Sequence, residues 1–258
     1  MIDLPSIFPN HCRGAVSLTY DDALDAHLDN AIPDLEAAGL RGTFYIPTRQ
    51  ENAWQTRPDQ WRAAHARGHE IANHTQYHPC SGKHPWVKPN FRLEAYSLAR
   101  MESELLGAAA DLMPVIGAGA TSFAYPCGEW TVGPDESTYR PMIARLFPAG
   151  RGVALKKQLV DPLDCDFSFV PAWVLTDKTR TDDVIGFIDD AIEHARWAVL
   201  IFHGVGGGHA IDVARDTHRA ICRELAVRRE EIWCDTFLTV AQHIRQKSSK
   251  PWGAPRRV

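Results

Sequence analysis

Short apolar runs alternate with longer segments of helical periodicity along the chain. A short apolar run between turn residues is typical of a buried strand, and apolar residues at i, i+3 and i+4 indicate a helix with one buried face. The predicted strands are 15–20, 42–46, 70–73, 121–125, 152–155, 167–170 and 197–202, with a weaker eighth near 231–234. The predicted helices are 24–38, 59–67, 91–112, 137–147, 182–195, 213–229 and 236–246.

The ends of three of these helices carry recognisable signals. Gly39 and Gly68 follow the first two helices, where a glycine commonly ends a helix because it adopts positive φ without strain. Thr181 precedes the helix 182–195 and is a favourable N-cap residue. These signals support the predicted boundaries.

Alternation of strands and helices indicates an α/β fold with parallel strands and helices packed outside them. Seven or eight such units predict a closed or nearly closed barrel, and a doubly wound open sheet is the alternative. In both architectures, functional residues collect at the C-terminal ends of the strands.

Composition places the chain among ordinary globular proteins. Its 258 residues are 45% hydrophobic and 23% charged, and no linker or low-complexity segment divides them. We therefore expect one catalytic domain over residues 1–258. The formal net charge is −4 and no basic stripe is present, so a nucleic-acid partner is not expected. No apolar stretch approaches the roughly 20 residues of a membrane span.

Location and redox state are predicted from the N-terminus and the cysteines. The first five residues show no basic region followed by an apolar run, so we expect no signal peptide and a cytoplasmic protein. An extracytoplasmic location stays open if the chain is a trimmed form of a longer one. The six cysteines form no CxxC pair; their even number permits disulfides, but without a secretion signal we expect reduced, buried thiols.

Adjacent carboxylates end the first predicted strand. Asp21 and Asp22 follow an apolar run, where two carboxylates are costly unless positive groups compensate them. The alternative is structural: Asp22 caps the helix that begins near Leu24, and Asp21 points to solvent.

Two histidines follow the third strand at a spacing of four. If the chain turns helically there, the rings of His74 and His78 face the same way. Two neutral imidazoles and one carboxylate are a common set of ligands for a divalent metal. Together with Asp22 at the end of another strand, the pair indicates a metal site.

Two further segments can contribute to such a site. After the fourth strand, Pro126 fixes φ and Gly128 permits a sharp turn, which can direct backbone N–H groups inward. After the seventh strand comes His203, where an imidazole can exchange protons at the mouth of a barrel. The glycine-rich segment 204–208 lacks the Lys-Ser/Thr of a phosphate-binding loop and is interpreted as a loop that approaches a ligand or moves.

In this order, these residues resemble the polysaccharide deacetylases, the family 4 carbohydrate esterases with a NodB-type domain. The resemblance spans about residues 14 to 245. The matching segments are Thr19-Tyr20-Asp21-Asp22, His74-Thr75-Gln76-Tyr77-His78, Ala124-Tyr125-Pro126-Cys127-Gly128 and Leu200-Ile201-Phe202-His203. The resemblance implies a distorted (β/α) barrel of seven to eight parallel strands with outer helices.

The resemblance also implies roles for individual residues. Asp22, His74 and His78 would hold a divalent metal, usually Zn²⁺, with Co²⁺, Ni²⁺, Mn²⁺ or Fe²⁺ as alternatives. Asp21 would be the general base and His203 the general acid. Oxyanion and substrate contacts would come from Tyr125, Pro126, Cys127 and Gly128.

The chain departs from the family pattern in two motifs. Ala124 stands where the third motif has Arg, which in the family pairs with the base, so we expect the pKa of Asp21 to rise by about 1–3. Arg151 or Arg49 could take the place of that Arg, and the sequence leaves this open. The fourth motif, an Asp followed by Trp, has no clean match around Asp161, Asp164, Asp166 and Trp173, so no group is identified that orients His203.

The predicted function is therefore a metal-dependent hydrolase that removes an acyl group, most simply acetyl, from an amino or hydroxyl group of a sugar or polysaccharide. One alternative is a deformylase or amidohydrolase acting on a C–N bond of a small or lipid- or nucleotide-linked precursor. Another is a non-catalytic, metal-retaining sugar-binding protein. The sugar, the acyl group, the metal and the oligomeric state are not predicted.

Overall fold

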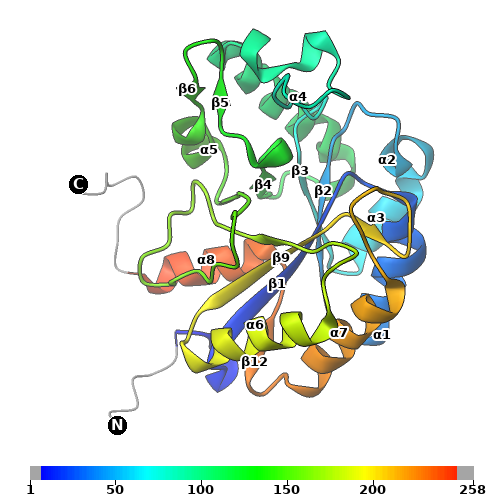
Figure 1. Ribbon diagram of the computed structural model, residues 1–258, viewed down its shortest axis with the longest axis vertical. Helices are drawn as coiled ribbons and strands as arrows, with labels where there is room; N and C mark the ends of the chain where they lie inside the picture. Colours follow the sequence, from blue (N-terminus) through cyan, green and yellow to red (C-terminus); the bar gives the residue numbers. More distant parts are fainter. Residues whose placement is uncertain (1–6, 249–258) are drawn as a thin grey trace.

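A computed structural model describes residues 7–248 of the protein, so the signal-peptide prediction on residues 1–5 falls outside the described residues. Its main feature is an eight-stranded parallel sheet with the order β7-β4-β3-β2-β1-β9-β8, in which β12 also pairs with β1. Figure 1 shows β1 and β9 side by side at the centre. The strands are β1 (Gly14–Asp21), β2 (Thr43–Ile46), β3 (Glu70–Asn73), β4 (Phe123–Ala124), β7 (Gly150–Arg151), β8 (Trp173–Val174), β9 (Trp197–Phe202) and β12 (Ile232–Cys234).

The sheet curls back toward itself through the segment that leads into β8. The N–H of Gly152 donates to the carbonyl oxygen of Val170 at 2.8 Å, and the N–H of Val170 donates to the carbonyl oxygen of Gly150 at 2.7 Å. Residues 167–172 therefore connect β7 to β8, which pairs with β9. The predicted distorted (β/α) barrel is confirmed as a curled half-barrel, in preference to a doubly wound open sheet.

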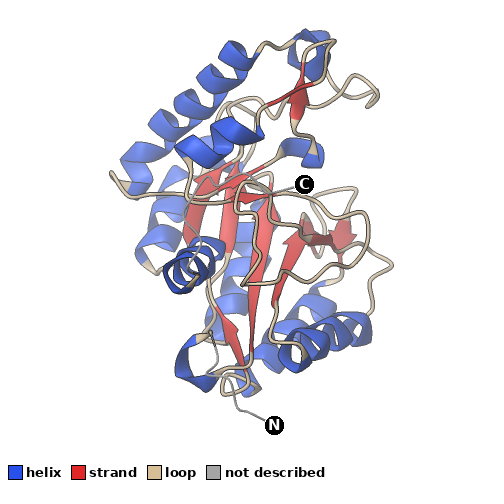
Figure 2. Ribbon diagram, turned by 90° about the vertical axis from the view of Figure 1, so that its left-hand side faces the viewer, coloured by secondary structure: helices blue, strands red, loops and turns tan. Residues whose placement is uncertain are grey.

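Helices surround this sheet (Figure 2). They are α1 (Ile32–Ala37), α2 (Ala53–Thr56), α3 (Pro58–Ala66), α4 (Leu98–Ile116), α5 (Arg140–Leu146), α6 (Thr181–Glu193), α7 (Arg215–Val227) and α8 (Phe237–Lys247). A π-helical turn, η2 (His27–Ala31), precedes α1, and 3-10 turns occur at η1 (Pro9–His11), η3 (Pro89–Phe91), η4 (Leu93–Ala95) and η5 (Pro126–Gly128). No helix within residues 7–248 is long and apolar enough to span a membrane.

Several predicted helix boundaries need correction. The helix predicted over 91–112 begins at Leu98, because Ser97 accepts the N–H of Arg100 and caps it there after two 3-10 turns. Residues 137–138 form the strand β6 (Ser137–Thr138), which pairs with β5 (Thr131–Val132) before α5 begins. Thr181 lies inside α6, whose N-cap is Arg180.

Strand predictions on one side of the barrel were also too long. The predicted strand 167–170 makes only an isolated bridge, between Val170 and Arg151. The strand predicted over 152–155 lies at Gly150–Arg151, and that over 121–125 is reduced to Phe123–Ala124. The glycine stops are confirmed, since Gly39 and Gly68 have φ of 67° and 94°.

Burial on both faces explains why the central strands consist of continuous apolar runs. All eight residues of β1 and all six of β9 are buried, as parallel strands covered on both faces must be. Alternate residues point to opposite faces: Leu18 and Tyr20 pack in the cluster that includes α1, α6 and α7, whereas Val199 and Ile201 pack in the barrel interior with α8. This alternation decides which polar side chains point inward at the strand ends.

Candidate active site

Four ionisable side chains share the inward-facing register at the carboxyl ends of the strands. Asp21, His203 and His74 each continue an interior position of their strand, two residues after Thr19, Ile201 and Ala72. Arg151 does the same on β7, two residues after Ala149, which also lies in the interior cluster. The period of two therefore brings together residues that are up to 182 positions apart in the sequence.

The chain bends sharply where β1 ends. Asp22 and Ala23 have φ of 81° and 52°, in the left-handed region that costs a non-glycine residue about 1–2 kcal/mol. This bend keeps the Asp22 carboxylate at the site although it directly follows Asp21. The alternative in which Asp22 caps a helix is not observed: the N–H of Leu24 donates to Nδ1 of His27 instead, and Asp21 is buried.

Arg151 compensates the charge of Asp21. Its Nη2 donates to Oδ1 at 2.6 Å and to Oδ2 at 2.5 Å, and its side chain is fully buried. Burial would raise the pKa of Asp21, but Arg151, followed by His74 and His203, holds that pKa below its ordinary value. The expectation that the pKa of Asp21 rises without the third-motif Arg is therefore wrong.

The register of the sheet explains how Arg151 reaches this position. β4 and β7 are parallel neighbours, and Ala124 pairs directly with Arg151. The cation missing at position 124 thus comes from the adjacent residue on the next strand. Arg49, the other candidate, pairs with Asp111.

Asp22, His74 and His78 bring one ligand atom each to within 4.8 Å of one another. Oδ1 of Asp22 lies 3.4 Å from Nε2 of His78 and 3.9 Å from Nε2 of His74. Two ligands, each about 2.1 Å from a tetrahedral Zn²⁺, lie about 3.4 Å apart. The three residues therefore fit a divalent metal.

The hydrogen bonding of His74 supports this fit. Its Nδ1 lies 2.8 Å from the carbonyl oxygen of Ala124 and donates to it, which leaves the lone pair on Nε2, the nitrogen that faces Asp22. Metal-ligating histidines are commonly held by such a bond on the other nitrogen. Burial lowers the pKa of His74 to about 4, so the ring is neutral at physiological pH.

Three other groups of metal-binding residue types occur within residues 7–248. Two of them include Cys127, whose sulfur is taken by a disulfide. The third, Asp190 with Glu193 and His194, is exposed near the end of α6. The triad at the strand ends is thus the best-formed of the four.

His74 and His78 meet without the predicted helical turn. Thr75 and His78 have φ of 65° and 52°, so the segment is an irregular loop, yet the two rings lie 4.7 Å apart. Glu104 of α4 holds this loop, since its Oε2 accepts the N–H groups of Gln76 at 3.1 Å and Tyr77 at 3.0 Å.

His203 faces the carboxylates from the end of β9. Its Nε2 lies 4.0 Å from Oδ2 of Asp21, and its carbonyl oxygen accepts a hydrogen bond from Nε2 of the buried His27 at 2.7 Å. Within residues 7–248, Nδ1 of His203 is buried without a hydrogen-bond partner. Neither Asp166, which pairs with Arg140, nor Asp161, which pairs with Arg196, takes the place of a fourth-motif Asp there.

A disulfide joins two of the loops at the site. Cys80, two residues after His78, is bonded to Cys127. The expectation of reduced thiols is wrong for this pair, because the fold brings together two cysteines that are 47 positions apart. Cys222 and Cys234 are free thiols.

The segment Tyr125 to Gly128 contributes mainly backbone. Tyr125 is fully buried and its hydroxyl donates to the carbonyl of Ser168. Cys127 has φ of 55°, and the N–H of Gly128 is used within the turn, at 2.9 Å from the carbonyl of Tyr125. Of this segment, the N–H of Cys127 is the candidate donor to a ligand.

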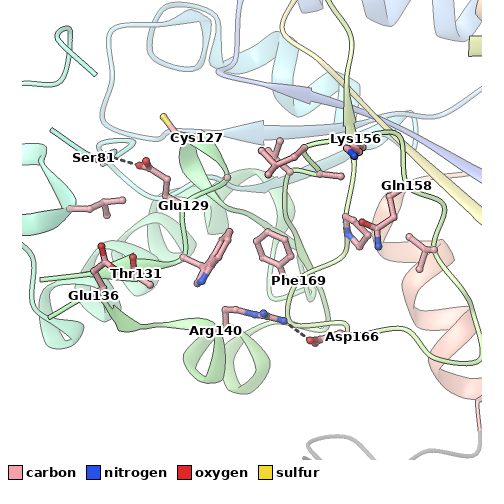
Figure 3. Close-up of a pocket in the computed structure, with 18 of the residues that line it drawn as sticks. Ser81, Cys127, Glu129, Thr131, Glu136, Arg140, Lys156, Gln158, Asp166 and Phe169 are labelled. Atoms are coloured by element: carbon pink, nitrogen blue, oxygen red, sulfur yellow. Dashed lines mark hydrogen bonds and ion pairs between the residues drawn. The ribbon is translucent and has the colours of Figure 1, made fainter. Parts of the chain in front are cut away.

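A cavity of about 1190 Å³ adjoins this turn. Figure 3 shows Cys127 and Lys156 along one edge and the Arg140–Asp166 ion pair along the opposite edge, with Phe169 between them. Trp130, 43% exposed, also lines it. A second cavity, of about 440 Å³, is lined by His78 and by Trp86, which is 60% exposed.

Sequence reasoning missed three supports of the site: His27, Glu104 and the Cys80–Cys127 bond. Glu104 had a usable signal, because it is an acidic residue among the buried positions of α4. His27 had none, since its partner is a carbonyl group 176 positions away in the chain. The disulfide pairing depends on the fold of two loops.

The sequence of the chain matches a family model described as polysaccharide deacetylase over residues 9–137, which is half of its length. The chain belongs to the polysaccharide deacetylase family. Its expected enzyme class, a deacetylase hydrolase, follows from this membership. No curated protein sequence matches the chain, and the assignment of all of residues 1–258 to one catalytic domain stays a prediction.

Solved structures share this fold at low sequence identity. Peptidoglycan deacetylase PdaC from Bacillus subtilis matches with 15% identity and a TM-score of 0.54, covering 91% of this chain and 92% of that one. A family 4 acetyl xylan esterase from Clostridium thermocellum, in complex with cobalt, matches with 16% identity and a TM-score of 0.55, covering 90% and 92%. A family 4 pseudoenzyme from Bacillus anthracis matches with 14% identity and a TM-score of 0.52, covering 88% and 65%.

The disulfide is expected to stabilise the fold. We predict that the double substitution Cys80→Ser and Cys127→Ser lowers the free energy of unfolding by about 2–4 kcal/mol, because the bond restricts the unfolded chain. Urea unfolding followed by tryptophan fluorescence measures this. A reductant should destabilise the wild-type protein and leave the double variant unaffected. Equal stability of the two proteins without reductant would contradict the prediction.

Proposed function

We propose that this protein is a metal-dependent hydrolase that removes an acyl group, most simply acetyl, from an amino or hydroxyl group of a sugar or glycan. The observation that carries the proposal is the placement of Asp21. Its carboxylate lies between the metal-binding triad and His203, with Oδ2 3.9 Å from Nε2 of His74 and 4.0 Å from Nε2 of His203. A base, an acid and a metal site therefore adjoin one another.

The triad of Asp22, His74 and His78 would hold the metal, with zinc as the first choice for two imidazoles and one carboxylate. When bound, the metal would supply Lewis-acid polarisation of the acyl carbonyl and a lower pKa for attacking water.

Asp21 is the proposed general base. Arg151 keeps its carboxylate ionised, so it is ready to accept a proton. Arg151 also fixes the orientation of the Asp21 carboxylate through one hydrogen bond to each of its oxygens. A base in this position accepts the proton of the attacking water.

His203 is the proposed general acid. Its Nε2 faces the site, and the bond from His27 to its carbonyl oxygen fixes the backbone beneath it. Burial lowers the pKa of His203, which makes the imidazolium a stronger proton donor to a leaving amine or alkoxide. The N–H of Cys127 is the proposed donor to the oxyanion of the tetrahedral intermediate.

A glycan rather than a small amide is favoured by the cavity that adjoins Cys127. At about 1190 Å³ it exceeds the roughly 300–1,000 Å³ of ordinary small-molecule sites. Trp130 and Phe169 offer apolar ring surface, and Arg140, Lys156 and Gln158 offer hydrogen-bond donors, a mixture suited to sugar rings with their hydroxyl groups.

Acetate release tests the proposed activity. Purified protein is treated with chelator, reloaded with Zn²⁺, Co²⁺ or Mn²⁺, and incubated with chitooligosaccharides, acetylated xylan and acetylated sugar nucleotides. We expect metal-dependent release from at least one of them and no release by the chelated protein. Tight metal binding without release from any substrate would favour a sugar-binding protein instead.

Two substitutions separate the base from the metal ligands. We expect Asp21→Asn to bind metal but to lose kcat by about 10²–10⁴, the usual contribution of positioned proton transfer. His74→Ala should lose both metal binding and activity. Metal content after dialysis and kcat are the two measurements. A fully active Asp21→Asn protein would refute the assignment of the base.

Arg151 should set the acidic limb of the pH profile. Because Arg151 lowers the pKa of Asp21, Arg151→Ala should raise that pKa, and the base should stay protonated up to a higher pH. The acidic limb of the pH profile of kcat/KM should then move to higher pH by about 1–3 pH units.

A second substitution controls for this change. Ala124→Arg in the Arg151→Ala background places a guanidinium on the paired residue of the neighbouring strand and should move the limb back. Circular dichroism checks that both variants are folded. A limb that does not move in a folded Arg151→Ala protein would contradict the proposed pairing.

A further inference from the structure

A glycine-rich loop places one more histidine at the site. The loop joins β10 (Gly204–Val205) to β11 (Asp212–Val213), two short strands that pair in parallel. Gly206, Gly207 and Gly208 have φ of 70°, 113° and 92°, values that other residues rarely adopt. These conformations turn the chain back and place His209 beside Asp22 and His203.

The loop that carries His209 is anchored on both sides. The N–H of Gly207 donates to Oδ1 of Asp212 at 2.9 Å, and Nδ2 of Asn30 donates to the carbonyl of Val205 at 2.8 Å. A Cβ atom at Gly204 would lie 2.4 Å from Oδ1 of Asp212 and 2.7 Å from the carbonyl oxygen of Gly207, so the loop packs closely on itself. His209 is therefore held in a defined place.

His209 presents a nitrogen to the outer oxygen of Asp22. Its Nε2 lies 3.9 Å from Oδ2 of Asp22, whereas Oδ1 of the same carboxylate faces His74 and His78. At 3.9 Å, Nε2 of His209 and Oδ2 of Asp22 are not hydrogen-bonded. Nδ1 of His209 lies 3.0 Å from the backbone nitrogen of Ile211 and 3.3 Å from its carbonyl oxygen, so Ile211 holds the ring in place.

The ring of His209 also lies against the proposed general acid. The His203 and His209 rings are stacked, with centroids 4.9 Å apart and planes inclined by 17°. Nδ1 of His203 has no hydrogen-bond partner within residues 7–248. The contact with the His209 ring therefore restricts the orientation of the His203 ring in place of such a hydrogen bond.

We propose that His209 is a positioning residue for His203: its ring stacks on the His203 imidazole and holds the plane of that ring. The inference rests on the proposed metal site and hydrolysis. A ring that holds the plane of His203 keeps its Nε2 directed at the site. His209 would therefore affect proton transfer by His203 without being a catalytic residue itself.

Two substitutions of His209 test this contact. His209→Phe keeps a ring to stack on His203, whereas His209→Gln has a side chain of similar length without a ring. His11→Phe is the matched control, because His11 is exposed on the 3-10 turn η1. Zinc dissociation constants come from competition with a chromophoric chelator, which requires no substrate, and circular dichroism of the metal-free proteins checks the fold.

We expect both His209 variants to bind zinc as tightly as wild type, because His209 makes no hydrogen bond to a residue of the triad. At saturating zinc, His209→Gln should lower kcat about tenfold with little change in KM, which is a part of the roughly 10²–10⁴-fold contribution of proton transfer. His209→Phe should keep the kcat of the wild-type protein. His11→Phe should match wild type in both measurements.

An equal loss of kcat in folded His209→Phe and His209→Gln would overturn the inference. Full kcat in His209→Gln would overturn the contact with His203. Failure of the wild-type protein itself to bind zinc would instead refute the metal site of the proposed function.

Discussion

Two adjacent carboxylates at the end of a buried strand are the constraint on which the rest of the site depends. Asp21 ends the β1 strand, which is buried along its whole length, and Asp22 directly follows it, so uncompensated charges there would cost several kcal/mol each. Arg151 compensates Asp21 directly. Asp22 faces His74 and His78, which lower its pKa and would share a cation with it. The proposed chemistry follows from the same compensation, because it keeps both carboxylates ionised.

Arg151 supplies, from the strand next to Ala124, the cation that the family resemblance implies at position 124. The two residues pair directly across β4 and β7 and share the inward-facing side. A guanidinium starting from Arg151 therefore reaches the same carboxylate. The structures that share this fold include enzymes and a pseudoenzyme, so the fold alone does not decide activity. In this chain the proposed base and the proposed acid, Asp21 and His203, are both present at the strand ends.

Much of the fold was predictable because the central strands β1 and β9 are continuous apolar runs and the helices between strands have clear periodicity. Periodicity failed where β4, β7 and β8 are only two residues long and hydrogen bonds of the loop 167–172 connect β7 to the segment before β8. At the site, the ordered motifs located Asp21, Asp22, His74, His78 and His203. Their supports were harder to predict, since His27, Glu104 and the Cys80–Cys127 bond act through long-range contacts with backbone groups or loops.

The central claim is that the triad at the strand ends binds the metal beside Asp21. Anomalous diffraction at the zinc edge from crystals of the zinc-loaded protein tests it most directly. The account predicts a strong peak about 2.0–2.2 Å from Oδ1 of Asp22 and from Nε2 of His74 and His78. An anomalous map whose only strong peak lies elsewhere would contradict the account, for example a peak between His84 and Glu129 or at the exposed group of Asp190, Glu193 and His194.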